Sequence, residues 1–388
     1  MADRPGTAAQ PGRIVDLFAG AGGWDEGLRD LGYEAVGIDC DEWACATARA
    51  AGHERVEADI AALDPRAFGP VWGLIGSPPC QAYSTAGKGL GRFDKEHVIA
   101  CAHELAAGHD SRAEHLAECR DPRSLLTVEP LRWALALRPR WIALEQVPPV
   151  LELWTLFAGL LSVHGYQAVA GVLSAERYGV PQTRKRAYLI ASLDGPVRLP
   201  EPTRRSYNPR RPDHVPDDER HLPRWVSMAD ALGWRPDAVT HTNNQTDSGR
   251  RPKGLARAAS CPARTLDSAS GSWTVEQPAD PPPPGWTARR PATTVCPTPR
   301  ISAPMRERDP DWQPGDRPPA QWKGSLRITV EQAAALQGFP PDYPWQGSRT
   351  RQFLQIGNAV CPPIARLVVA AAAGIDAGAV EGRGRRSR

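Results

Sequence analysis

The chain has 388 residues, 41% of them hydrophobic and 23% charged, with a formal net charge of +3. A chain of this length can bury a large core without oligomerising, and its composition excludes the disordered, fibrous and disulfide-rich classes. No uninterrupted apolar run is long enough to span a bilayer, and the start, MADRPGTAAQPG, lacks the apolar core of a signal peptide. We therefore expect a cytoplasmic monomer with no membrane attachment and with its eight cysteines as free thiols.

The first strand that the sequence predicts, residues 13–18 (RIVDLF), runs into a glycine-rich turn. A helix follows, with apolar side chains at helical spacing over residues 24–31. Together these three elements present backbone amides at a helix N-terminus, an arrangement that suits a nucleotide-like ligand. The glycines of the turn are Gly20, Gly22 and Gly23.

A second predicted strand, residues 35–38, ends at Asp39. An acid at the tip of the second strand can bind both hydroxyls of a ribose, so Asp39 is a candidate ligand contact. Its alternative role is the N-cap of a helix predicted over residues 39–50. A third unit ends in ADI at residues 58–60. Successive strand tips with polar groups predict an α/β fold, a doubly wound Rossmann-like sheet with its ligand along the carboxyl edge.

A short apolar run, residues 71–75 (VWGLI), predicts a buried strand that leads to Pro78, Pro79 and Cys80. Proline fixes φ and removes a backbone donor, so the two prolines hold the thiol in one extended geometry. A thiol presented rigidly at the carboxyl end of a strand suits a nucleophile. The alternative is a buried cysteine that only ends a strand, because free cysteine is among the most buried residue types.

Residues 93–120 form a polar insert that favours helix and contains Cys101, His103, His115 and Cys119. His115 and Cys119 stand four residues apart, which places both on one face of a helix and makes a zinc site conceivable. The insert lacks the cleaner ligand spacing of zinc motifs, so a solvated helical face is the favoured interpretation and no metal is expected.

Two later segments place charged side chains beside predicted strands. The strand at residues 141–144 ends at Glu145, and a carboxylate at a strand tip suits a proton donor. The segment QTRKR at 182–186 precedes another strand; Arg184 and Arg186 are two apart, so in an extended segment they share a face and can grip a phosphate or a base edge. The alternatives are a solvated edge acid and surface salt bridges.

The composition changes over residues 199–323, which contain 22 of the 40 prolines. Proline at this density disfavours long helices, so we expect loops and short strands. Lys and Arg number 19 there against 15 Asp and Glu, a net of +4, and basic pairs alternate with tryptophans. Such interleaving suits nucleic acid, although tryptophans more often belong to a core. Helical spacing returns at residues 328–337, and residues 364–373 predict a terminal helix.

In this order the motifs resemble those of the DNA (cytosine-5)-methyltransferases, over nearly the whole chain. The matching segments are DLFAGAGG (16–23), GSPPCQAYS (76–84), EQV (145–147), QTRKR (182–186), RPATTV (290–295), LQGFP (336–340) and QIGNAVCPP (355–363). Any one is a weak pattern, but seven in the family's order make coincidence improbable. The resemblance decides between the two roles of Cys80 in favour of the nucleophile.

The resemblance implies S-adenosylmethionine as cofactor and double-stranded DNA as partner, with a cognate restriction endonuclease as a candidate second partner. Matching positions give these cofactor contacts: Phe18, Gly20, Gly22, Gly23, Asp39, Asp59, Ile60, Pro79, Asn358 and Val360. The implied catalytic residues are Cys80, Glu145, Arg184 and Arg186, and the implied substrate contacts are Gln81, Ser84 and Gln182. No metal is part of this set.

The implied reaction methylates C5 of a cytosine that is flipped out of the duplex. The Cys80 thiolate adds to C6, and Glu145 protonates or hydrogen-bonds N3, so that C5 becomes enamine-like and takes the methyl group. Two positions depart from the family: Gln146 replaces Asn and Tyr83 replaces Phe. Since Gln146 is one methylene longer, we expect the hydrogen bonds that pin the Pro-Cys loop to shift.

The predicted domains are a first catalytic part at 12–198, a target-recognition domain at 199–324 and a catalytic return at 325–376. Residues 1–11 and 379–388 are predicted to be disordered. The main hypothesis is a DNA cytosine-5 methyltransferase of restriction-modification or stand-alone type. One alternative is a tRNA cytosine-5 methyltransferase, which the absence of a Cys-Phe-Thr sequence in the recognition region disfavours. The other is a catalytically silent DNA-binding member of the family.

Overall fold

The computed structural model describes residues 12–79, 93–211, 213–234, 236, 238–242, 255–266, 274–276 and 325–378. Contacts within the chain divide it into two compact units. The first unit comprises Met1–Leu173, Lys185–Glu201 and Val360–Arg388, and the second comprises Ser174–Arg184 and Pro202–Ala359. Several predictions lie outside the described residues: Cys80, Gln81, Tyr83, Ser84, the segment 290–295 and both termini.

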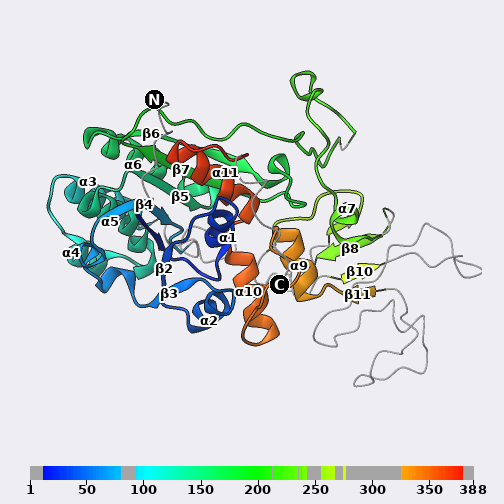
Figure 1. The fold of residues 1–388 in the computed structure, drawn as a ribbon, viewed down its shortest axis with the longest axis horizontal. Coiled ribbons are helices and arrows are strands. Elements are labelled where there is room, and N and C mark those ends of the chain that lie inside the picture. The colour runs from blue at the N-terminus through cyan, green and yellow to red at the C-terminus, as the bar shows by residue number, and fades with distance from the viewer. Residues whose placement is uncertain are drawn as a thin grey trace, which may run out of the picture. The chain divides into compact units, whose positions relative to one another are not determined.

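The first unit is built on a seven-stranded sheet of order β3-β2-β1-β4-β5-β7-β6 (Figure 1). Its strands are β1 (Arg13–Leu17), β2 (Val36–Asp39), β3 (Glu54–Glu57), β4 (Val71–Gly76), β5 (Trp141–Gln146), β6 (Gln167–Ser174) and β7 (Lys185–Ser192). The pairs from β3 to β5 are parallel, whereas β7 is antiparallel to β5. The order runs outward from β1 in both directions, so the predicted α/β, doubly wound Rossmann-like class is confirmed.

Helices cover both faces of this sheet. They are α1 (Gly23–Arg29), α2 (Glu42–Ala50), α3 (Lys95–Ala106), α4 (Arg112–Glu118), α5 (Glu129–Leu137), α6 (Leu151–Val163) and α11 (Pro362–Ala373). Val15 and Leu17 of β1 belong to a hydrophobic core with residues of α3, α5 and α6. Because side chains alternate along a strand, Ile14 and Asp16 face the other side, where α1 and α11 pack together.

Two glycines allow α1 and α11 to approach closely. A Cβ atom at Gly23 would lie 2.3 Å from the Val360 carbonyl oxygen, and one at Gly27 would lie 2.6 Å from the Arg366 nitrogen. Neither distance is compatible with a side chain, so glycine is required at both positions. Helix α11, which also contacts β5 and β7, therefore packs directly against α1.

The second unit contains a four-stranded sheet of order β11-β10-β8-β9. Its described elements are α7 (Met228–Leu232), β8 (Val239–Thr242), β9 (Leu255–Ala258), β10 (Thr274–Glu276), β11 (Ser325–Arg327), α9 (Val330–Gln337) and α10 (Arg349–Asn358). The described part of residues 199–323 holds one short α-helix and one 3₁₀ turn (Asp217–Glu219), which agrees with the expectation of loops and short strands. Helix α9 contacts α7 and α10, so contacts group residues 325–359 with this unit, whereas the predicted catalytic return began at 325.

The polar insert folds onto the first unit through α3, which buries Val98, Cys101, Ala102 and Leu105. Helix α4 buries none of its residues, as predicted for a solvated face. His115 of α4 lies within hydrogen-bond distance of Glu104, at 3.0 Å between Nε2 and Oε2. Within the described ranges no group of three His, Cys, Asp or Glu side chains could hold a metal ion.

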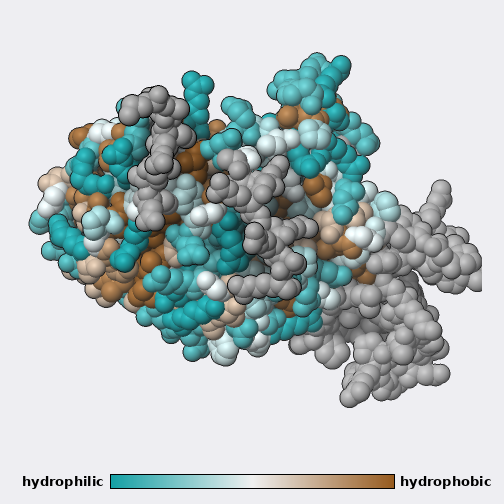
Figure 2. Space-filling view, in the orientation of Figure 1, coloured by the Kyte–Doolittle hydropathy of each residue, from teal (hydrophilic) through white to brown (hydrophobic). Residues whose placement is uncertain are grey.

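Most large apolar side chains of the described residues are buried. Among the described residues the large hydrophobic side chains that are exposed are Trp43, Phe93, Leu116, Val163 and Val172. The face in Figure 2 is largely hydrophilic between scattered apolar residues. One stretch, Arg349–Ala373, is long and apolar enough for a membrane span by composition, but 61% of its most apolar window is buried. It is also interrupted between α10 and α11, so these are core helices of the fold.

Candidate active site

The turn between β1 and α1 has an unusual backbone. Gly20 and Gly22 have φ angles of +56° and +108°, and Phe18, which is not a glycine, has a φ of +58°. A left-handed residue with a bulky side chain costs conformational energy, and such strain is concentrated at functional sites. A Cβ atom at Gly20 would meet no atom of the described residues within 4 Å, so within that part of the chain open space borders the turn at this point.

Asp39 at the end of β2 is tied to this turn. Its carboxylate accepts the amide of Gly20 and the amide of Asp41, both at 2.8 Å. Burial raises the pKa of Asp39, and these two hydrogen bonds partly offset that effect. The N-cap of α2 is Asp41, which accepts the Ala44 amide, so the alternative role predicted for Asp39 is wrong. A carboxylate has about four acceptor sites, so two remain for a ligand's hydroxyls.

The turn after β3 carries Asp59 and Ile60. Asp59 is exposed and accepts the Ala61 amide at the start of a 3₁₀ turn, whereas the Ile60 side chain is buried. Arg132 of α5 donates to the carbonyl oxygens of Ile60 and Leu63, at 2.9 and 3.1 Å. Helix α5 therefore fixes this turn through Arg132, at the same carboxyl edge of the sheet as Asp39.

The residues that lead to Cys80 are anchored at three points. The Ser77 amide donates to Leu17, and the Trp24 indole donates to the Ser77 hydroxyl at 2.8 Å. The Gln146 side chain donates to the Pro78 carbonyl at 2.5 Å, and its own oxygen accepts the Val147 amide at 2.5 Å. The Gln that replaces Asn in this chain thus supplies a bond that pins the segment directly before the predicted nucleophile.

Glu145 lies within β5, one residue before the strand ends, and is 5% exposed. Its Oε1 lies 3.0 Å from Nε of Arg186, which belongs to β7. Antiparallel pairing sets Glu145 opposite Tyr188, two residues from Arg186 on the same face. The structure therefore brings Glu145 and Arg186 together as an ion pair at the edge where β4 delivers Pro78.

Of the remaining predicted residues, Pro79 and Val360 belong to the first unit, whereas Gln182, Arg184 and Asn358 belong to the second. Gln182 is fully buried; its amide group donates to Leu336 and Gln337, and its oxygen accepts the Leu266 amide. Arg184 precedes β7, is 3% exposed and donates to the Gly357 carbonyl at 2.8 Å. Asn358 ends α10 and is exposed. Arg184 and Arg186 thus contact different groups, because the strand begins between them.

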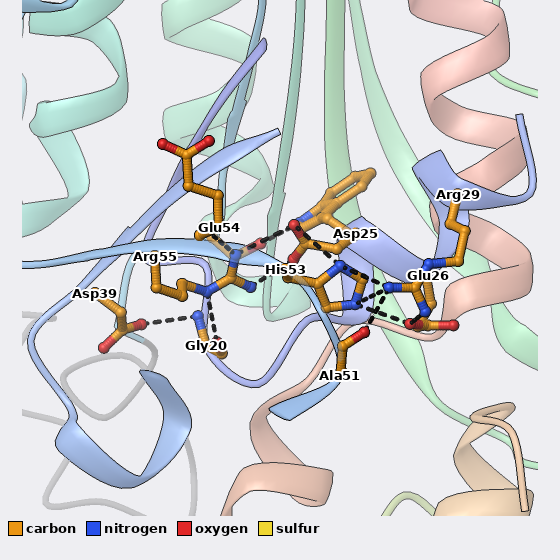
Figure 3. Close-up of polar contacts among 11 residues, drawn as sticks. Gly20, Asp25, Glu26, Arg29, Asp39, Ala51, His53, Glu54 and Arg55 are labelled. Carbon is orange, nitrogen blue, oxygen red and sulfur yellow. Dashed lines mark hydrogen bonds and ion pairs between the residues drawn. The ribbon is translucent and has the colours of Figure 1, made fainter. Parts of the chain in front are cut away.

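No pattern in the sequence singled out the buried charges beside the glycine-rich turn. Arg55 of β3 forms a two-bonded ion pair with Asp25 of α1, and its Nε donates to the Gly20 carbonyl at 3.3 Å (Figure 3). Neither carboxyl oxygen of Asp16 has a hydrogen-bond partner in the part of the chain that the structure describes, and burial raises the pKa of this group well above its ordinary value. In the sequence, Arg55 is a lone arginine in the segment ERVE, and charged residues in such a segment are also typical of a solvated edge strand.

The sheet order and the glycine-rich turn define a Rossmann-like α/β domain with its ligand edge at the carboxyl ends of the strands. The fold is similar to that of the Dnmt2 methyltransferase of S. pombe, with a TM-score of 0.53 and 14% identity over 92% of this chain and 97% of that one. It is similar also to the EhMeth methyltransferase of Entamoeba histolytica, with a TM-score of 0.52 and 15% identity over 94% and 98% of the two chains.

The family follows from the sequence match. Residues 12–103 and 110–373 match the model of the C-5 cytosine-specific DNA methylases, so the chain belongs to that family and is a DNA-modifying enzyme. It is 26% identical to the type II methyltransferase M1.HphI of Haemophilus parahaemolyticus, over 92% of this chain and 85% of that protein. It is 26% identical to M.NgoMIV of Neisseria gonorrhoeae over 91% and 95%, and 28% identical to M.NaeI of Lentzea aerocolonigenes over 92% and 73%.

Proposed function

We propose that this enzyme transfers a methyl group from S-adenosylmethionine to C5 of a cytosine in double-stranded DNA, through a covalent bond to Cys80. One observation carries the proposal. Neighbouring strand ends bring Pro78, which Gln146 holds, to the edge that bears the Glu145–Arg186 ion pair. We infer that this carboxyl group and guanidinium act on the base that Cys80, two residues after Pro78 in the sequence, attacks.

The residues at the carboxyl edge fit the proposed cofactor. Gly20 leaves open space beside a turn whose backbone is fixed, and Asp39 retains acceptor capacity for ribose hydroxyls. Phe18, Gly22, Gly23, Asp59, Ile60, Pro79 and Val360 would complete the contacts in the first unit. When bound there, S-adenosylmethionine supplies an electrophilic methyl group.

The chemistry of the chain's own residues follows from cytosine, whose C5 is a poor nucleophile. In the proposal the Cys80 thiolate forms a bond to C6 while Glu145 gives a proton or hydrogen bond to N3. Electron density then moves to C5, which takes the methyl group. A water molecule then accepts the C5 proton, the electron pair of that C–H bond re-forms the C5–C6 double bond, and Cys80 leaves as the thiolate, which restores the aromatic ring. Arg186 holds Glu145 in a fixed orientation throughout.

The proposed substrate is duplex DNA from which the target base is flipped, at a cost of about a few kcal/mol that protein contacts must offset. Arg186, Gln81 and Ser84 are the proposed contacts to the flipped base and its backbone. Gln182 and Arg184 are buried, so we assign them the role of holding the QTRKR segment in place. The type II names of the relatives support a restriction-modification setting, with a nuclease as partner.

The test is transfer of labelled methyl from S-adenosylmethionine to duplex DNA by the purified protein and by Cys80→Ala. Wild type should methylate cytosine at C5, and Cys80→Ala should lose the activity completely. The control is Cys45→Ala, a fully buried cysteine of α2, which should keep it. Equal activity of Cys80→Ala contradicts the mechanism; activity on tRNA but not on DNA, or on neither, contradicts the substrate. Gel filtration and cell fractionation test the expected monomer and its cytoplasmic location.

A further inference from the structure

Arg55 of β3 contacts the glycine-rich turn at the carboxyl edge, and the proposed mechanism gives it no role. Strand pairing sets Asp16 of β1 opposite Gly37 of β2, and Gly37 opposite Arg55 of β3. Residues directly opposite each other in a sheet share a face, so these three positions form one row across the sheet. The row lies on the face that α1 covers.

Gly37 leaves a gap in this row, and the Arg55 side chain fills it. A Cβ atom at Gly37 would lie 2.2 Å from Nη1 of Arg55 and 2.7 Å from the Ala19 Cβ atom, so a residue with a side chain would displace the guanidinium. Arg55 can therefore reach across β2, with its side chain completely buried, to Asp25 on α1. Figure 3 shows the guanidinium between Gly20 and Asp25.

The Gly20 residue is consequently held from both sides. Its amide donates to the Asp39 carboxylate, and its carbonyl accepts from Nε of Arg55. Gly20 has a left-handed φ of +56° and no side chain of its own to fix it. The ion pair with Asp25 and the bond to the Glu54 carbonyl leave Nε as the group that points at the turn.

We propose that Arg55 is a positioning residue for the methyl donor: by holding the Gly20 carbonyl it orients the Gly20 amide and, through that amide, the Asp39 carboxylate. This rests on the proposed function, since Asp39 and Gly20 are its cofactor contacts. The rival explanation is a structural ion pair that only joins α1 to β3. The two differ because the ion pair needs a positive charge, whereas the bond to Gly20 needs the Nε–H group, which lysine lacks.

A matched control lies in the same network. Glu26, next to Asp25 on α1, joins the helix to the segment before β3 through His53, at 2.8 Å, and also pairs with Arg29. Among the described residues, none of the bonds of Glu26 involves Gly20 or Asp39. Glu26→Gln therefore weakens the same helix-to-sheet connection, which His53 extends to Asp25 at 4.0 Å, but leaves the hydrogen bonds of Gly20 to Arg55 and Asp39 in place.

The experiment measures the affinity of the purified full chain for S-adenosylmethionine by calorimetry, in wild type, Arg55→Lys, Arg55→Met and Glu26→Gln. We expect both Arg55 variants to bind at least about tenfold more weakly, which corresponds to the loss of about one hydrogen bond to a charged group. Glu26→Gln should stay within about twofold of wild type. In the methylation assay the Arg55 variants should raise KM for the donor while kcat at saturating donor and KM for DNA stay unchanged. Hydrogen exchange at the Gly20 amide should accelerate in Arg55→Lys, without global unfolding.

The other possible results contradict either the positioning role of Arg55 or the proposed function. Wild-type affinity in Arg55→Lys contradicts the positioning role and leaves a structural ion pair. An equal loss in all three variants also contradicts it, because the effect then follows the helix-to-sheet connection. No affinity in the wild type refutes the proposed function, and this inference with it.

Discussion

The hydrogen bond from Gln146 to the Pro78 carbonyl yields the sharpest prediction for a single side chain. Gln146 is 2% exposed, and its donor lies 2.5 Å from the Pro78 oxygen. In Gln146→Leu that oxygen loses its partner while buried, which costs about 1–3 kcal/mol. In Gln146→Asn the amide withdraws by one carbon–carbon bond, about 1.5 Å, so contact is kept only if the Pro78 segment moves.

Both changes act two residues before Cys80, so activity should fall as well as stability. We expect Gln146→Leu to lower kcat by about 10- to 100-fold, since a misplacement of about 1 Å in a catalytic group has an effect of this size. Gln146→Asn should lie between Leu and wild type. The measurements are urea unfolding followed by tryptophan fluorescence, and methyl transfer at saturating DNA and donor.

Tyr166→Phe is the matched control, because the Tyr166 hydroxyl donates to the Pro139 carbonyl at 2.7 Å in a buried site of the same unit. It should lose about 1–2 kcal/mol of stability and keep its kcat. If Gln146→Leu keeps both wild-type stability and wild-type kcat, the bond to Pro78 does not hold the loop. If Tyr166→Phe loses as much activity, the loss reflects stability alone.

Three further predictions concern the surroundings of this edge. Gly23→Ala should lower the free energy of unfolding by about 1–3 kcal/mol, because its Cβ would meet the Val360 carbonyl at 2.3 Å; an unchanged urea midpoint contradicts the contact. Burial raises the pKa of Asp16 above its ordinary value, so wild-type stability falls as pH rises from about 4, the pKa of an unperturbed aspartate, to the folded-state pKa. Asp16→Asn does not titrate and should therefore gain stability relative to wild type over this rise; a difference independent of pH refutes this. Burial raises the pKa of the Cys45 thiol to about 11, so at pH 8 iodoacetamide should label it only in urea; rapid labelling of the folded protein would disprove this.

Local patterns predicted the strands that form the edge. The apolar runs at 71–75 and 141–144 lie in strands that are buried almost throughout, so their hydrophobicity alone marked β4 and β5 and placed Glu145 within one residue of the end of its strand. The apolar run at 35–38 likewise predicted β2 and placed Asp39 at its end. In each case the signal lies within a few neighbouring residues.

Other features depend on partners far away in the sequence. Arg55 is turned inward because Gly37 leaves room and Asp25 supplies the opposite charge, and neither relation is visible in the segment ERVE. Helix α10 was not predicted, since RTRQFLQIGN has only a narrow apolar face that α9 covers. Arg184 was expected to share a face with Arg186, but β7 starts at Lys185, so the alternation of a strand does not extend to it.

The central claim is that Cys80 forms a bond to the target cytosine, and one measurement tests it most directly. Duplex DNA with 5-fluorocytosine is incubated with the enzyme and S-adenosylmethionine, and a denaturing gel and peptide mapping follow. Fluorine at C5 blocks the final elimination, so the account predicts a stable protein–DNA adduct that requires the methyl donor, maps to Cys80 and is absent from Cys80→Ala. An adduct at another residue, or methylation of ordinary cytosine with no adduct on the fluorinated base, would contradict it.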